Sequence, residues 1–163
     1  MPPPDAQPID DLRVELACFE LDGTLYGVEV AQVREIVRPP PLVRLPHAPE
    51  LIEGVVDLHG VVLPIVDLGR ALGLVLRTDP AHSRIAVLQV DDLMFGLRVA
   101  AAVDVLSLPA AQLEELPRLA AQAGYEAVRA VVRRNGAKPL LVLSLEALLE
   151  RVYRSARSAE EAA

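Results

Sequence analysis

The residues with the strongest claim to chemistry lie in one short stretch of this 163-residue chain. Asp57 and His59 stand two positions apart, and Asp67 follows within the same apolar segment. On a strand, Asp57 and His59 would point to one face, and a carboxylate that orients an imidazole is half of a catalytic triad. However, no serine sits in a nucleophile elbow. We therefore favour a structural interpretation, in which Asp57 and His59 bond the backbone of a turn and Asp67 caps a helix.

The sequence has no pattern typical of a cofactor or metal site. His47, His59 and His82 lack the spacing of metal ligands, and Cys18 is the only cysteine. The glycines form neither a dinucleotide-binding fingerprint nor a phosphate-binding loop. We expect no catalytic residue, no cofactor and no metal. Cys18 lies in an apolar run and is expected to be a buried, inert thiol.

Composition narrows the class of partner. The net charge is −7, and aromatic residues make up only 3% of the chain. Nucleic-acid binding needs a basic face, and base stacking needs aromatic side chains, so neither is expected. The N-terminus does not resemble a signal peptide, and no apolar segment approaches the roughly 20 residues that cross a bilayer. We therefore expect a cytoplasmic protein without direct membrane insertion.

The candidate residues for chemistry lie on an apolar hairpin over residues 54–68, which is followed by a short helix. Glycine tolerates the positive φ of a tight reversal, which places the turn at Gly60. Pro64 cannot donate to a ladder, which predicts an edge strand or a bulge. Asp67 would cap a helix over residues 68–72 that ends at Gly73. Core positions are expected at Val55, Val61, Val62, Ile65 and Val66.

Dipeptides typical of tight turns predict further hairpins. Asp22-Gly23, Asp91-Asp92 and Asn135-Gly136 each separate two strand-like runs. Additional strands are predicted over residues 42–45 and 103–108. No internal repeat of fixed period is found, and this many short strands favour small β-barrels over an open sheet.

Predicted order varies between the N-terminus, an internal segment and the C-terminus. Residues 1–12 are rich in proline and are expected to be disordered. Segment 116–125 is alanine-rich and could be helix or loop. Ser144 would cap the longest helix, which has a single amphipathic stripe, and the chain is expected to fray beyond Ser158.

A second apolar stripe is predicted on residues 30–37. Val30, Val33, Ile36 and Val37 have the spacing of one face of a two-turn helix. Such a helix could plug a core, or it could line a groove that receives a helix from a partner. Composition leaves both possibilities open.

Several motifs, taken in order, resemble the CheW family of bacterial chemotaxis adaptors, whose domain also occurs at the end of the histidine kinase CheA. They span almost all of residues 14–150, which makes the resemblance specific. The matching segments are residues 19–28, the Val-Arg-Glu-Ile-Val run at 33–37, Leu45-Pro46 with Pro49, Ile52 with Gly54-Val55, the hairpin at 54–68, residues 105–108 and residues 141–149.

The resemblance implies a mainly β fold of two intertwined, small, SH3-like five-stranded β-barrels over residues 13–158, with short helices, a C-terminal amphipathic helix and a frayed tail over 159–163. It also implies a non-enzymatic adaptor of chemotaxis or motility signalling. Family members bridge the cytoplasmic tip of a chemoreceptor (a methyl-accepting chemotaxis protein) to the regulatory domain of a CheA-type histidine kinase. The chain would then be recruited to receptor arrays in the cytoplasm.

The resemblance assigns receptor-binding positions that overlap the predicted stripe. In the family, the Val-x-Glu-Ile segment and the glycine before the central hairpin lie at the receptor surface. The expected receptor-binding residues are therefore Val30, Val33, Glu35, Ile36, Val37 and Gly54. The turn is expected to lie near the partner surface through Asp57, His59 and Gly60.

The same turn departs from the family pattern. The usual Asn-Leu-Arg-Gly is here Asp57-Leu58-His59-Gly60, so a permanently charged, multi-donor guanidinium is lost. The usual Val-Asp-x-Val is here Val99-Ala100-Ala101-Ala102. These changes indicate a divergent paralogue, and one alternative is a specialised protein that binds receptor but not kinase. A remote alternative is an enzyme that uses Asp57, His59 and Asp67. A module for proline-rich ligands is disfavoured by the scarcity of aromatic residues.

Overall fold

Tight turns build the hairpins of this fold, as the sequence predicts. The computed structural model describes residues 12–74, 78–100, 103–116 and 126–162. Asp22 and Gly23 have φ values of 51° and 78°, and His59 and Gly60 have values of 52° and 82°. Two successive positive φ values are typical of two-residue turns that match the twist of paired strands. The predictions for residues 1–11 and for most of segment 116–125 lie outside the described residues.

Short strands alternate with brief helical turns along the chain. The strand predicted over residues 42–45 is only a single bridge between Val43 and Val55. The elements are β1 (Arg13–Leu21), β2 (Thr24–Glu29), the 3-10 helix η2 (Val30–Gln32), β3 (Val33–Val37), β4 (Ile52–Leu58), β5 (Val61–Asp67), α1 (Leu68–Ala71), η3 (Pro80–His82), β6 (Ser83–Val90), β7 (Leu93–Ala100), β8 (Val103–Pro109), η4 (Ala110–Gln112), β9 (Leu113–Glu115), β10 (Val128–Val132), β11 (Leu140–Leu143) and α3 (Leu145–Ala162).

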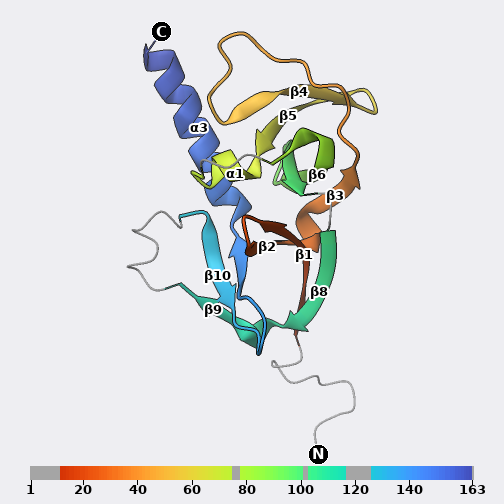
Figure 1. The fold of residues 1–163 in the computed structure, drawn as a ribbon. Coiled ribbons are helices and arrows are strands. Elements are labelled where there is room, and N and C mark those ends of the chain that lie inside the picture. Colours follow the sequence, from red (N-terminus) through yellow and green to blue (C-terminus); the bar gives the residue numbers. More distant parts are fainter. Residues whose placement is uncertain (1–11, 75–77, 101–102, 117–125, 163) are drawn as a thin grey trace, which may run out of the picture.

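The strands form two interleaved sheets, one above the other in Figure 1. The first has the order β8-β1-β2-β11-β10-β9, and the second has the order β3-β6-β7-β5-β4. The chain leaves the first sheet after β2, builds the whole second sheet and returns at β8. The predicted pair of small intertwined barrels is therefore confirmed. The first sheet has six strands instead of five because β8 pairs along β1.

Both sheets repeat one arrangement that no sequence period reveals. In each, two hairpins join through a parallel pair of strands, β2 with β11 and β5 with β7. In each, a strand that follows a 3-10 helix pairs with the outer strand of the second hairpin, β3 with β6 and β9 with β10. The molecule thus contains a structural duplication, although the sequence shows no repeat of fixed period.

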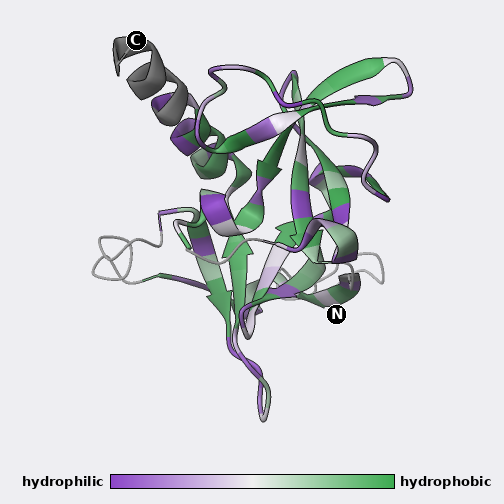
Figure 2. Cartoon of the chain, turned by 45° about the horizontal axis from the view of Figure 1, so that its top comes forward, coloured by the Kyte–Doolittle hydropathy of each residue, from purple (hydrophilic) through white to green (hydrophobic). Residues whose placement is uncertain are grey.

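Apolar side chains form one cluster inside each barrel and a larger cluster between the barrels. The central cluster unites Phe19 of the first sheet, Leu97 of the second and Leu148 of α3, all of them 3% exposed or less. Strands and the inner face of α3 are largely apolar where they meet (Figure 2). Burying one large apolar side chain contributes roughly 1.5–3 kcal/mol, so the shared cluster holds the two barrels together.

Cys18 lies in the interior of the first barrel. Its side chain is 2% exposed, and its thiol donates to the carbonyl of Leu16. Burial raises the pKa of the Cys18 thiol from 9.0 to about 11, because an apolar environment disfavours the thiolate. The prediction that the Cys18 thiol is buried is therefore confirmed.

The central hairpin corrects two predictions. Val61 and Val62 are 48% and 63% exposed, so they are not core residues, whereas Ile65 and Val66 are buried. Pro64 lies in β5, which is an interior strand because β4 takes the edge.

The sheet accommodates Pro64 because Val55, its partner on β4, directs both backbone groups away from β5. Val55 N–H and C=O bond Val43 at 2.9 Å in each direction. No ladder hydrogen bond is therefore needed between Val55 and Pro64. On the opposite side of β5, the parallel ladder with β7 begins only at Ile65.

Both helices that follow a strand begin at the predicted caps. Asp67 Oδ2 accepts from the Arg70 N–H at 3.1 Å, and Ser144 Oγ accepts from the Ala147 N–H at 3.2 Å. Helix α3 spans Leu145–Ala162, and the expected fraying beyond Ser158 stays a prediction. The described helices are all too short or too polar to cross a lipid bilayer.

Candidate partner-binding surface

Residues 30–37, which the sequence predicts as a helix, are mostly a strand. A single 3-10 turn leads into β3, and β3 pairs antiparallel with β6. The helical prediction is wrong for two reasons. The β-branched residues Val33, Ile36 and Val37 suit a pleated strand, and pairing with β6 satisfies backbone groups that an isolated two-turn helix would hold only weakly.

The strand distributes the predicted stripe over different environments. Val33 packs against the central cluster, and Val37 packs against the cluster inside the second barrel. Val30 and Glu35 are half-buried. Ile36 is 39% exposed. Ile36 is therefore the residue of the stripe that is most open to a partner.

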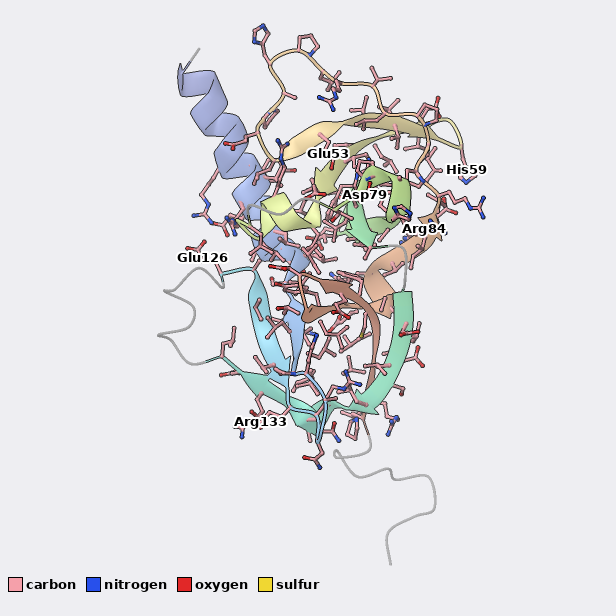
Figure 3. All side chains as sticks on the ribbon, in the orientation of Figure 1. Glu53, His59, Asp79, Arg84, Glu126 and Arg133 are labelled. Atoms are coloured by element: carbon pink, nitrogen blue, oxygen red, sulfur yellow. The ribbon has the colours of Figure 1, made fainter. Side chains whose placement is uncertain are left out.

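The turn between β4 and β5 lies over β3. Asp57 Oδ1 accepts the Gly60 N–H at 3.0 Å, which stabilises the turn as the structural interpretation predicts. His59 occupies the left-handed region, which costs energy for a residue with a Cβ. In this position His59 Nε2 lies 3.2 Å from Glu35 Oε1 (Figure 3). Both side chains remain accessible, His59 at 74% and Glu35 at 40%.

This contact joins two parts of the expected partner surface that are far apart in the chain. The sequence predicts the turn and the 30–37 segment as separate elements. In the structure, Glu35 of β3 lies beside the turn that carries His59. No local pattern could have indicated this pair, because it depends on how the hairpin folds over β3.

Gly54 lies beneath the surface and is buried. A Cβ at this position would come within 2.4 Å of the Val43 carbonyl oxygen, a distance that real side chains do not tolerate. The close approach allows the Val43–Val55 bridge to cover the edge of β4. The lack of a side chain at Gly54 therefore lets the segment around Val43 pack directly against β4.

A largely buried ion pair holds β4 next to Gly54. Arg98 is 3% exposed, and its Nε donates to both carboxylate oxygens of Glu53 at 3.1 and 3.0 Å. Arg98 Nη1 also donates to Ser83 Oγ at 2.8 Å. Glu53 lies in the β-bulge that separates Ile52 from Gly54. No sequence pattern indicates this pair, since a single charged residue in a strand carries no signal of its burial.

Comparisons with known proteins agree with this architecture. A family model described as "CheW-like domain" matches residues 15–153. The chain belongs to the CheW family. The chemotaxis protein CheW of Rhizobium meliloti is 33% identical over 128 residues, which cover 78% of this chain and 83% of that protein. The probable chemotaxis protein CheW of Rhizobium etli is 31% identical over 134 residues, which cover 82% and 86% of the two chains.

A solved structure of a CheW scaffold supports the same assignment. The scaffolding protein TtCheW from Thermoanaerobacter tengcongensis superposes with a TM-score of 0.75 at 26% sequence identity. The match covers 84% of this chain and 88% of that chain. The fold of this CheW-family chain, with its two intertwined barrels, is thus that of a known scaffold.

The catalytic alternative for this CheW-family chain does not match the geometry. Asp67 is 1% exposed and accepts two backbone N–H groups, from Arg70 at 3.1 Å and from Thr78 at 3.2 Å. His59 is exposed on a turn and faces Glu35 instead of either aspartate. The three residues therefore serve separate structural roles. Within the described residues, no group of His, Cys, Asp and Glu is placed to hold a metal ion.

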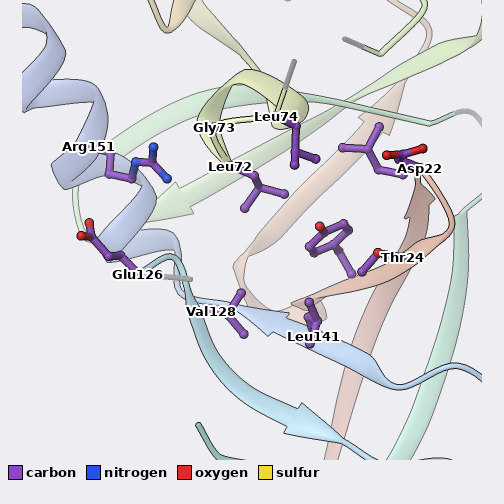
Figure 4. Close-up of a pocket in the computed structure, with 11 residues that line it drawn as sticks. Asp22, Thr24, Leu72, Gly73, Leu74, Glu126, Val128, Leu141 and Arg151 are labelled. Atoms are coloured by element: carbon purple, nitrogen blue, oxygen red, sulfur yellow. The ribbon is translucent and has the colours of Figure 1, made fainter. Parts of the chain in front are cut away.

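A cavity of about 490 Å³ lies between the barrels of this CheW-family chain, on the side of α1 and α3. Apolar side chains from both barrels line it, among them Leu72, Val128 and Leu141, with Asp22 and Arg151 towards opposite ends (Figure 4). It contains none of the residues expected to bind a partner. The cavity is therefore separate from the surface around Ile36 and His59.

Proposed function

We propose that this chain is a non-enzymatic chemotaxis adaptor that couples the cytoplasmic tip of a methyl-accepting chemoreceptor to the regulatory domain of a CheA-type histidine kinase. It would act in the cytoplasm, recruited to receptor arrays. One observation carries the proposal beyond family membership. The His59–Glu35 contact brings the turn and β3 together, and the resemblance assigns both to the partner side.

The receptor surface would use one apolar anchor with polar neighbours. Ile36 supplies exposed apolar area, and Glu35 on the same strand and His59 on the neighbouring turn supply an acceptor and a donor. Interfaces commonly place their binding energy in a few such anchors and surround them with polar contacts. A receptor helix could lay its apolar face on Ile36 and pair a polar side chain with Glu35. Val30, Val33, Val37 and Gly54 would shape the surface from below.

Binding to each partner separately tests the proposal. The full chain is titrated with a chemoreceptor cytoplasmic fragment and, in a second experiment, with the regulatory domain of a CheA-type kinase. We expect saturable binding to both at tens of micromolar or tighter, measured by calorimetry. If neither partner binds at these concentrations, the adaptor function is wrong.

A protein that binds receptor but not kinase is the second candidate. The family arginine in the central turn is here His59, which has fewer N–H donors and no permanent charge. If the second candidate is correct, the wild-type chain binds the receptor fragment alone. His59→Arg should then restore kinase binding, whereas His82→Arg, at another exposed histidine, should not. Kinase binding by the wild-type chain would exclude this candidate.

A further inference from the structure

Helix α3 carries more apolar surface than the core uses. Leu145, Leu148 and Val152 face the central cluster and are 0%, 1% and 8% exposed. Leu149 is only half-buried, and Tyr153 is 49% exposed. Leu149 and Tyr153 are spaced i, i+4 and are therefore neighbours on the helix surface. Together they form a flank that the fold itself does not cover.

The β6–β7 hairpin forms the opposite wall of a groove along this flank. Val90 and Leu93 line the wall, and Leu93 is 44% exposed. Together with Leu149 and Tyr153 they bound an open groove of about 400 Å³, which we name the α3 groove. In Figure 1, α3 and β3 lie on opposite sides of the molecule, while the hairpin wall of the α3 groove continues from β6, which pairs with β3 at Leu88 and Val33.

The rim of the α3 groove is acidic. Glu146 and Glu150 line it on the helix side. Asp91 and Asp92 form the exposed turn between Val90 and Leu93 on the hairpin side. Arg154 is the basic residue among those that line the groove, and its guanidinium lies 3.4 Å from Glu126. An apolar floor between acidic edges is complementary to apolar side chains flanked by lysine or arginine.

We propose that the α3 groove binds a cationic amphipathic helix of a partner protein. The topology favours a helix over an added strand, because β6 and β7 are both interior strands and offer no free edge for backbone pairing. Recognition must therefore occur through side chains. A helix presents apolar residues in one stripe, which would contact Leu93, Leu149 and Tyr153, and its flanking cations would face Glu146 and Glu150. This inference does not depend on the proposed receptor or kinase contacts.

A synthetic peptide serves as the probe. It is an amidated, fluorescein-labelled helix with leucines at i, i+3, i+4 and i+7 spacing and lysines elsewhere, titrated with the full chain by fluorescence anisotropy. We expect micromolar binding that weakens severalfold between low and physiological salt, because exposed charges are screened. A scrambled peptide of the same composition should bind at least fivefold more weakly, since it lacks the apolar stripe.

Matched variants localise the binding. Tyr153→Ser should weaken binding of the probe at least fivefold, whereas Val105→Ser, which removes a 63% exposed apolar side chain from β8, should leave it unchanged. Glu146→Gln combined with Glu150→Gln should weaken binding and flatten its salt dependence. Glu15→Gln combined with Glu115→Gln removes the same charge from other exposed positions and should have a smaller effect.

Two results would overturn the inference. One is equal affinity of the probe for the wild-type chain and for Tyr153→Ser with an unchanged circular dichroism spectrum. The other is an effect of the Glu15/Glu115 pair as large as that of the Glu146/Glu150 pair, which would mean that the peptide follows net charge alone. Absence of binding below 100-fold molar excess would equally reject the site.

Discussion

The segments around β3 and β9 have similar local structure and related sequences, with three identical residues in seven, but they meet different neighbours. Residues 30–36 read Val-Ala-Gln-Val-Arg-Glu-Ile, and residues 110–116 read Ala-Ala-Gln-Leu-Glu-Glu-Leu. Each begins with a 3-10 helix and continues as a strand. The residues that precede these helices, Glu29 and Pro109, have φ, ψ values of −59°, 128° and −61°, 136°. Similar local sequence thus produces similar local backbone in both barrels.

Contacts from distant parts of the chain make the two segments different. On β3, Glu35 meets His59 and Ile36 remains exposed. On β9, Glu114 pairs with Arg133 at 2.9 Å, and Leu116, the residue after β9, packs against the central cluster. Arg133 lies at the far end of the first barrel from His59 (Figure 3). The surface character of each segment is therefore set by the hairpin packed beside it.

The largest expected effect comes from Gly54→Ala. Its Cβ would lie 2.4 Å from the Val43 backbone oxygen, so the segment that covers the β4 edge must move. We expect the free energy of unfolding to fall by about 3 kcal/mol, at the upper end for overpacking. Urea unfolding provides the measurement. Gly27→Ala, in the first barrel, is the control, because its Cβ would meet the flexible end of Leu140 at 3.3 Å. Equal losses for both variants would contradict the special role of Gly54.

The next effect separates the two similar segments by function. Ile36→Asp should weaken binding to a chemoreceptor fragment at least tenfold while the chain remains folded, because Ile36 is exposed and no core contact is lost. The equivalent substitution Leu116→Asp should instead lower stability by about 1–2 kcal/mol, since it places a charge against the central cluster. Its receptor affinity should stay within about twofold of the wild type.

Calorimetric titration and urea unfolding of both variants provide the measurements. An unchanged receptor affinity in a folded Ile36→Asp variant would remove Ile36 from the proposed surface. Equal losses of affinity in both variants would mean that the two segments do not differ in function.

Turn chemistry and helix caps made most of the fold predictable. Asp22-Gly23 and His59-Gly60 adopt the positive φ values that tight hairpins need, and Asp67 and Ser144 cap helices as expected. These features depend on residues close in the chain. The pairing of β8 with β1 gave a sixth strand that no local pattern indicates, since register between distant strands depends on packing.

Periodicity failed where tertiary contacts decide the structure. The 30–37 segment has helical spacing of apolar residues, but pairing with β6 makes it a strand. Val61 and Val62 look like core residues, yet they are exposed because the hairpin projects beyond the barrel interior. The assignment of individual residues to a partner surface stays a prediction. The contact of His59 with Glu35 required the three-dimensional arrangement, because Glu35 lies on β3 and His59 lies in the turn between β4 and β5.

The interior of the first barrel contains the thiol of Cys18, which should make the stability of the chain sensitive to high pH. Burial raises the pKa of Cys18 in the first barrel from 9.0 to about 11. Between these values the unfolded thiol loses its proton while the folded thiol keeps it, so stability falls as pH rises. We expect wild-type stability to fall by roughly 1 kcal/mol more between pH 8 and pH 10 than that of Cys18→Val. Parallel pH profiles of the two proteins in urea unfolding would contradict this prediction.

The smallest expected effect concerns the pair that distinguishes β3 from β9. Because the His59 and Glu35 side chains are 74% and 40% exposed, their coupling in a double-mutant cycle of Glu35→Gln and His59→Asn should be less than about 0.5 kcal/mol in stability. Asparagine is chosen because it tolerates the positive φ of this position. Glu115→Gln, at the equivalent position after η4, should show no coupling to His59→Asn.

A coupling above about 1 kcal/mol would mean that the contact mainly holds the second barrel together. A small coupling in stability, combined with a severalfold loss of receptor affinity in either single variant, would instead mean that the pair presents Glu35 and His59 to a partner.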